Sequence, residues 1–125
     1  MANDVLLGSA IISSFIHTLF MAFYTPPVMY GTFLGTALIT SILNHRYTSD
    51  LLKWFDRIMM VLGTGITLYL APTLFLKLLI VVTGMLYGAA KILNSNLCHI
   101  GAHACITFIN ISICIFLYTT LKNTK

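Results

Sequence analysis

The sequence has very little charge and contains no glutamate. Of its 125 residues, 8% are charged and 58% are hydrophobic, and the mean hydropathy is +0.94. A soluble globular domain carries about 25% charged residues, so the composition excludes that class. The chain is therefore expected to be an integral membrane protein.

The basic residues are too few and too scattered for a nucleic-acid-binding protein, although the formal net charge is +4. They are not interleaved with aromatic residues in a soluble patch. Long uncharged runs separate them, as expected for residues at the ends of membrane helices. We interpret them as anchors beside the membrane surface, and we expect no nucleic-acid partner.

The cysteines do not form the pattern of a disulfide framework. There are three of them, Cys98, Cys105 and Cys114, and each lies in apolar sequence. An odd number in such surroundings predicts free thiols that pack as small hydrophobic side chains.

The N-terminal segment also lacks the features of a cleaved secretory signal. Asp4 stands where such a signal carries a basic residue. No small-residue cleavage site stands out after the apolar run. The first hydrophobic segment is therefore expected to remain as a membrane helix.

Five segments are long and apolar enough for membrane helices, which need about 20 residues to cross a hydrocarbon core of about 30 Å. Proline-containing turns and short polar stretches separate them. The expected helices cover residues 5–24, 28–45, 50–70, 74–92 and 97–121. The sequence thus predicts an all-α fold, a multi-pass transmembrane bundle of about five helices that forms a single domain.

Short connections force successive helices to run antiparallel, so the basic residues can be assigned to two membrane faces. One face holds the N-terminus and the loops near residues 47 and 95, and the other holds the proline turns and the C-terminus. The basic residues near the first face are Arg46, Lys53, Arg57 and Lys91, and those near the second are Lys77, Lys122 and Lys125. Because cytoplasmic loops are enriched in Lys and Arg, the first face is favoured as cytoplasmic.

An ionisable residue inside a membrane helix costs about 2.5–3.5 kcal/mol at the helix centre, and five such residues are candidates for a functional role. They are His17, His45, Asp56, His99 and His103. All except His17 lie near the first face. We interpret His17, alone in the first helix, as a polar residue whose hydrogen bonds are satisfied within the protein.

The other four residues have the pattern of a metal site. His99 and His103 are four residues apart, which places both imidazoles on one helical face about 6 Å apart along the axis. Three neutral histidines leave a fourth position open, as in catalytic zinc sites, and zinc lowers the pKa of a bound water to about 7. Asp56 is the one carboxylate placed to move the proton. Ser41 precedes His45 by four residues, so its hydroxyl points toward the same site.

Each of these features also has a simpler interpretation. A pair of histidines four apart is by itself a weak signal for metal. Asp56 beside Arg57 fits an interfacial ion pair or a charge at a helix start. Ser41 fits a helix-packing residue. Convergence of all of them on one side of the bilayer favours the metal site.

Three short motifs resemble the signature of a membrane hydrolase superfamily. They are SILNH at 41–45, KWFDRIMM at 53–60 and HIGAH at 99–103. That superfamily includes the alkaline ceramidases, the progestin and adiponectin receptors and the bacterial haemolysin III proteins. Its Ser and His close one helix, its Asp opens the next, and its HxxxH pair lies in the final helix.

The resemblance implies roles for five residues. His45, His99 and His103 would bind zinc, and Asp56 would contact and activate the zinc-bound water. Ser41 would stabilise the site or the oxyanion of the tetrahedral intermediate.

The chain departs from the superfamily in its number of helices. Members typically have seven, whereas one helix, at 74–92, separates the Asp helix from the HxxxH helix here. Removing a pair of helices keeps the HxxxH motif on the face that holds His45 and Asp56. The missing helices suggest a homodimer that completes the lipid cavity. Gly31 and Gly35, at GxxxG spacing, are expected first to serve helix packing within the chain, and a dimer contact is the alternative use.

The motifs favour an intramembrane zinc-dependent hydrolase that cleaves an amide or ester bond of a lipid, with ceramide-like substrates first. One alternative is a receptor-like or structural membrane protein with a non-catalytic zinc site. Another is a small channel or transporter whose histidines titrate near neutral pH. The ionisable residues gather at one face instead of tracing a path across the bilayer, which favours the hydrolase over a channel.

Overall fold

The structure, a computed structural model, describes residues 3–125. Within these residues the elements are five helices and no strand. The helices are α1 (Asp4–Phe23), α2 (Val28–Arg46), α3 (Asp50–Leu70), α4 (Leu74–Ile92) and α5 (Asn96–Asn123). The predicted all-α bundle is confirmed, and no predicted helix end differs from the observed one by more than two residues.

Side-chain caps explain where several helices begin. The Asn3 side chain accepts a hydrogen bond from the backbone N–H of Leu6 (3.1 Å), so α1 starts one residue earlier than predicted. Ser95 caps α5 in the same way through the N–H of Cys98 (3.3 Å), which also moves that start by one residue. Ser49 caps α3 through the N–H of Leu52 (3.5 Å). Such caps satisfy N–H groups that have no partner within the helix.

The turn from α4 to α5 is tight because Asn94 adopts a left-handed conformation, with φ of 49°. Asparagine tolerates this region better than other non-glycine residues. The N–H of Ser95 donates to the carbonyl of Ala90 (3.0 Å), which is the six-to-one bond of a Schellman motif. The turn therefore leaves the end of α4 and the start of α5 at the same end of the bundle.

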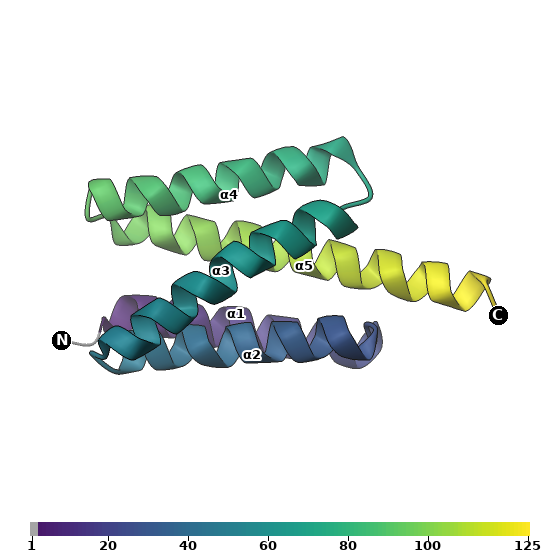
Figure 1. Ribbon diagram of the computed structural model, residues 1–125, viewed down its shortest axis with the longest axis horizontal. Coiled ribbons are helices and arrows are strands. Elements are labelled where there is room, and N and C mark those ends of the chain that lie inside the picture. Colours follow the sequence, from purple (N-terminus) through teal and green to yellow (C-terminus); the bar gives the residue numbers. More distant parts are fainter. Residues whose placement is uncertain (1–2) are drawn as a thin grey trace.

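The helices form two antiparallel pairs with a fifth helix crossing between them. Figure 1 shows α1 beside α2, α4 beside α5, and α3 running obliquely from the first pair to the second. The end of α2, the start of α3 and the start of α5 all lie at one end of the bundle. At 28 residues, α5 is about 42 Å long, and its C-terminal turns extend beyond the other helices (Figure 1).

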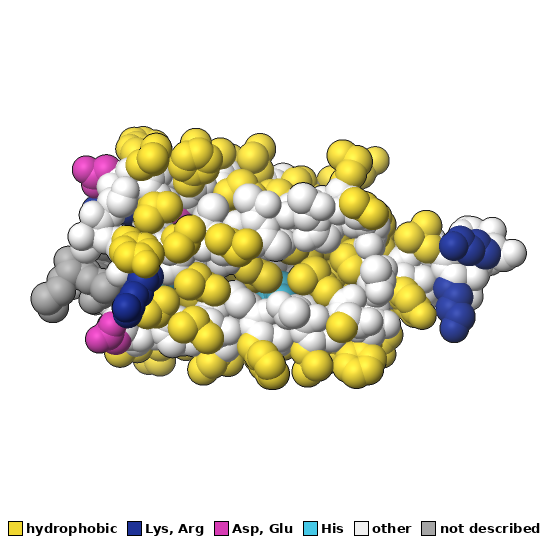
Figure 2. All heavy atoms as spheres, turned by 90° about the horizontal axis from the view of Figure 1, so that it is seen from below, with side chains coloured by type: hydrophobic (Ala, Val, Ile, Leu, Met, Phe, Trp, Pro, Cys, Tyr) yellow, Lys and Arg dark blue, Asp and Glu magenta, His cyan; other side chains and the backbone are white. Residues whose placement is uncertain are grey.

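The surface is that of a transmembrane bundle. Among the described residues, α1, α4 and α5 are long and apolar enough to cross a membrane. Figure 2 shows hydrophobic side chains over the middle of the molecule and charged side chains at its two ends. Large exposed apolar areas are rare on soluble monomers and are suited to contact with lipid. The helices α2 and α3 have similar lengths, 19 and 21 residues, and carry more polar residues.

Three hydrogen-bonded side-chain pairs join α1 to α5, which run parallel. They are Ser9–His103 (2.8 Å), Ser13–Thr107 (2.6 Å) and His17–Asn110 (3.1 Å). Hydrogen bonds between membrane helices contribute about 0.6 kcal/mol on average and up to about 1.7 kcal/mol. This polar seam sets the register of α5 against α1, and one end of it holds His103 in place.

His17 is a satisfied polar residue, as predicted. Its side chain is 2% exposed. Its Nδ1 is hydrogen-bonded to the carbonyl of Ser13 (2.8 Å) and its Nε2 to the Asn110 amide (3.1 Å). The Tyr30 hydroxyl in turn donates to the Asn110 carbonyl oxygen (3.2 Å).

The apolar core lies among α2, α4 and α5. Leu34, Ile109 and Ile113 are its most buried side chains, and Cys114 packs beside them. All three cysteines are free thiols, as predicted. Among the described residues, a Cβ built on Gly35 would meet no atom within 4 Å, so this glycine is not needed for close packing within the chain.

Candidate metal centre

The three histidines predicted as ligands come together at one end of the bundle. His45 lies in the last turn of α2, and His99 and His103 lie in the first turns of α5. Their ring centroids are 4.9 to 5.5 Å apart. One ligand atom from each ring lies within 4.8 Å of the other two. The three side chains are thus close enough to bind one metal ion.

The His45 ring has a buried nitrogen that is not satisfied within the protein. Its Nε2 has no hydrogen-bond partner among residues 3–125, and the residue is 7% exposed. Leaving a buried polar group without a partner costs about 1–3 kcal/mol. A metal ion at the centre of the three rings would remove this cost, because the free lone pair would become a ligand.

The His103 ring is oriented by a residue that the motifs do not reveal. Its Nδ1 is hydrogen-bonded to the Ser9 hydroxyl on α1 (2.8 Å), which leaves Nε2 to face an ion. Metal-binding histidines usually bond through their other ring nitrogen in this way. A signal for Ser9 does exist in the sequence, since Ser9, Ser13 and His17 follow one another at four-residue steps along an otherwise apolar helix.

Replacing Ser9 by alanine is expected to weaken zinc binding by about 10- to 100-fold, the range found for partners of metal-ligating histidines. Competition with a chromophoric zinc chelator would measure this change. Ser14→Ala is the matched control, because Ser14 lies on the same helix and its hydroxyl has no partner among residues 3–125. Equal affinity for zinc in the two variants would contradict the role given to Ser9.

Asp56 is buried at the same end of the bundle and is 7% exposed. Its Oδ2 accepts a hydrogen bond from the Asn44 side chain (2.8 Å). Asn44 adjoins His45, so this bond ties Asp56 on α3 to the helix that carries His45. The salt bridge found among residues 3–125 joins Lys53 to Asp50, and no salt bridge in this part of the chain involves Asp56. The interpretation of Asp56 as half of an ion pair with Arg57 is therefore wrong.

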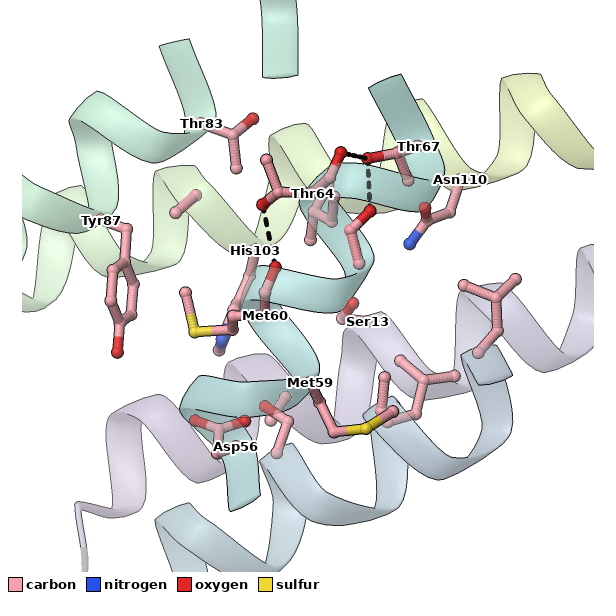
Figure 3. A pocket seen from close by; sticks show the side chains of 18 of the residues that line it. Ser13, Asp56, Met59, Met60, Thr64, Thr67, Thr83, Tyr87, His103 and Asn110 are labelled. Atoms are coloured by element: carbon pink, nitrogen blue, oxygen red, sulfur yellow. Dashed lines mark hydrogen bonds between the residues drawn. The ribbon is translucent and has the colours of Figure 1, made fainter. Parts of the chain in front are cut away.

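A cavity of about 190 Å³ connects these groups. Ser41, Asp56, His99 and His103 all line it, and most of the other lining residues are apolar. It exceeds the roughly 150 Å³ of an engineered apolar cavity that binds benzene. Figure 3 shows Asp56 and His103 toward one end of the cavity and Asn110 toward the other. The cavity can therefore hold part of an apolar ligand beside His99, His103 and Asp56.

Tyr87 on α4 is a further residue of this site. Its ring packs edge-on against the His99 ring, with centroids 5.3 Å apart. It lines the cavity at the end where Figure 3 places Asp56. The Lys91 ammonium lies 5.2 Å from the centre of the same ring. The four-residue spacing of Tyr87 and Lys91 is visible in the sequence, but their position beside His99 depends on how α4 packs against α5.

Comparisons with protein-family models, with curated proteins and with solved structures give no match to this chain. The superfamily resemblance of the three motifs stays a prediction.

Proposed function

We propose that the chain is an intramembrane zinc hydrolase that cleaves an amide or ester bond of a membrane lipid, with ceramide-like lipids as the favoured substrates. The observation that supports it most is the joint placement of three ligand-competent histidines and a buried carboxylate, with two of the histidines and the carboxylate on the wall of one largely apolar cavity. A purely structural site needs no carboxylate beside it and no cavity.

Zinc fits the donor set. An all-imidazole set suits zinc and other late transition metals, whereas Mg²⁺ and Ca²⁺ prefer oxygen ligands. Two nitrogens on one tetrahedral zinc lie about 3.3 Å apart, because each Zn–N bond is about 2.0–2.1 Å. Starting from ligand atoms within 4.8 Å of one another, each imidazole would move by less than about 1 Å to reach this geometry. Three protein ligands are also the number found in catalytic zinc sites.

When bound, zinc would supply an acidified water and polarise the substrate carbonyl. Asp56 would accept a proton from the attacking water at Oδ1, since Oδ2 already accepts the Asn44 hydrogen bond. The same carboxyl would then return the proton to the leaving amine or alcohol. The hydroxyls of Ser41 and Tyr87, which line the same cavity, are donors for the carbonyl oxygen as it gains negative charge.

The rest of the cavity favours an acyl lipid. Leu34, Ile80 and Ile106 provide apolar wall for an acyl chain. Thr67 and Asn110, farther along the wall, place polar side chains among these apolar residues (Figure 3).

Metal content and lipid turnover of the purified protein test this proposal together. We expect about one zinc per chain, as for a three-histidine site, and fatty acid release from an amide- or ester-linked lipid that stops on chelation and returns with zinc. Zinc retained without turnover of any lipid in the panel would favour the non-catalytic alternative. Absence of bound metal would overturn the proposal. Ion flux in liposomes that is lost in His45→Ala would favour a channel.

A further inference from the structure

A second hollow lies on the outside of the bundle between α3 and α4. Arg57, Met60, Val61, Thr64, Tyr87 and Lys91 line this groove. Three of them, Met60, Thr64 and Tyr87, also line the cavity beside the histidines. Groove and cavity are therefore separated by the thickness of the same few side chains.

The groove carries two positive charges that form no salt bridge among residues 3–125, although both lie near enough to the buried Asp56 for electrostatic attraction. Arg57 and Lys91 are both exposed, and the salt bridge found among residues 3–125 involves neither of them. Each cation lies over an aromatic ring, Arg57 over Trp54 (5.3 Å) and Lys91 over Tyr87 (5.2 Å). Cation–π contacts of this kind contribute about 0.5–1 kcal/mol at exposed sites and hold both charges beside the groove.

The remaining wall of the groove is suited to a hydrocarbon chain. Met60 and Val61 lie on α3 one turn beyond Arg57, and Val61 is 74% exposed. Arg57 is near the start of α3 and Lys91 near the end of α4, so the two charges lie at the end of the bundle that holds the metal centre. Charge at that end, followed by an apolar wall toward the middle of the bundle, matches an anionic headgroup joined to an acyl chain.

We propose that this groove binds a lipid whose headgroup carries a phosphate and passes it between α3 and α4 to the metal centre. The Arg57 guanidinium and the Lys91 ammonium would hold the phosphate oxygens, which both groups bind well. Tyr87 borders the groove and the cavity alike, so a carbonyl close to the headgroup would come to lie beside His99 and Asp56. This inference rests on the proposed hydrolase function and names its substrate class, an acyl lipid with a phosphate headgroup.

Two lipids that differ in one group test the inference. The probes are an N-acyl sphingoid lipid with a terminal phosphate and the same lipid with a hydroxyl in its place. Native mass spectrometry of the wild-type protein is expected to show binding of the phosphate lipid that is tighter by about tenfold or more, as charge-assisted hydrogen bonds to the phosphate imply. Equal binding of the two lipids by the wild-type protein would overturn the inference without any variant.

The variant R57Q/K91Q locates the effect. It is expected to bind the two lipids equally. The control variant R46Q/K53Q removes two positive charges from the same end of the bundle and is expected to keep the wild-type preference for the phosphate lipid. Equal loss in the two variants would show general attraction to the membrane surface and would overturn the inference. Because binding is measured without turnover, a preserved preference with no hydrolysis would count against the proposed function alone. Hydrolysis of both lipids with equal binding would count against the groove alone.

Discussion

His99→Ala and His103→Ala are each expected to remove the bound zinc and to abolish lipid hydrolysis. Each substitution leaves two imidazoles, whereas catalytic zinc sites use three protein ligands. The group that the structure brings together consists of the three histidines, and no Cys, Asp or Glu of the described residues belongs to it. His45→Ala is expected to have the same effect. Zinc per chain, measured by plasma mass spectrometry after dialysis, should fall from about one to near zero.

His17→Gln provides the matched control for these substitutions. His17 is also a buried histidine that lines the same cavity, but its two ring nitrogens are hydrogen-bonded to Ser13 and Asn110. Glutamine retains a donor and an acceptor, so zinc should stay bound. If the substitutions at His99 and His103 left the zinc content at the wild-type value, the site would be misassigned.

The sequence was sufficient to predict the helices and the proximity of the three histidines. Both depend on the local hydrophobic pattern and on the direction in which each helix runs. Apolar runs interrupted by prolines, Ser49 and the 94–96 turn determine the five helices. Antiparallel succession then places the end of α2 and the starts of α3 and α5 at one end of the bundle. The shared location of His45, Asp56 and the pair His99 and His103 follows from the order and direction of the helices alone, without knowledge of any packing angle.

The supporting residues could not be predicted because their partners depend on helix packing. Ser9 reaches His103 only because α1 and α5 run parallel in one register. Asn44 reaches Asp56 because α3 starts against the end of α2. Tyr87 contacts His99 because the turn at Asn94 folds α5 back onto α4. Side-chain contacts of this kind depend on axial shifts and crossing angles, which hydropathy does not encode.

The polar seam between α1 and α5 contains one histidine that supports helix packing and one that belongs to the candidate metal centre. His17 and His103 lie on neighbouring helices and both make hydrogen bonds across the seam. His17 has two partners and is satisfied. His103 has one nitrogen bonded to Ser9 and lies in the group that can bind a metal. The same stripe of residues thus fixes the register of the helices and leaves one histidine free to act as a ligand.

Asp56→Asn separates metal binding from catalysis. Asparagine has nearly the same shape as aspartate, and its side-chain oxygen can still accept the Asn44 hydrogen bond that Asp56 makes. Asp56 is not among the three grouped ligands, so zinc content is expected to be unchanged. The carboxamide cannot take up a proton from water, and turnover should fall by about 10²- to 10⁴-fold, the usual contribution of a general base.

The measurement is the rate of fatty acid release at saturating lipid, together with zinc content for each variant. Asp50→Asn is the control, because Asp50 lies on the same helix with a side chain that is 92% exposed and paired with Lys53. It should keep the wild-type rate. Zinc retained with an undiminished rate in Asp56→Asn would remove the proton-transfer role from Asp56. Since no other acidic residue lines the cavity in the described part of the chain, that result would leave the proposed hydrolysis without a carboxylate base.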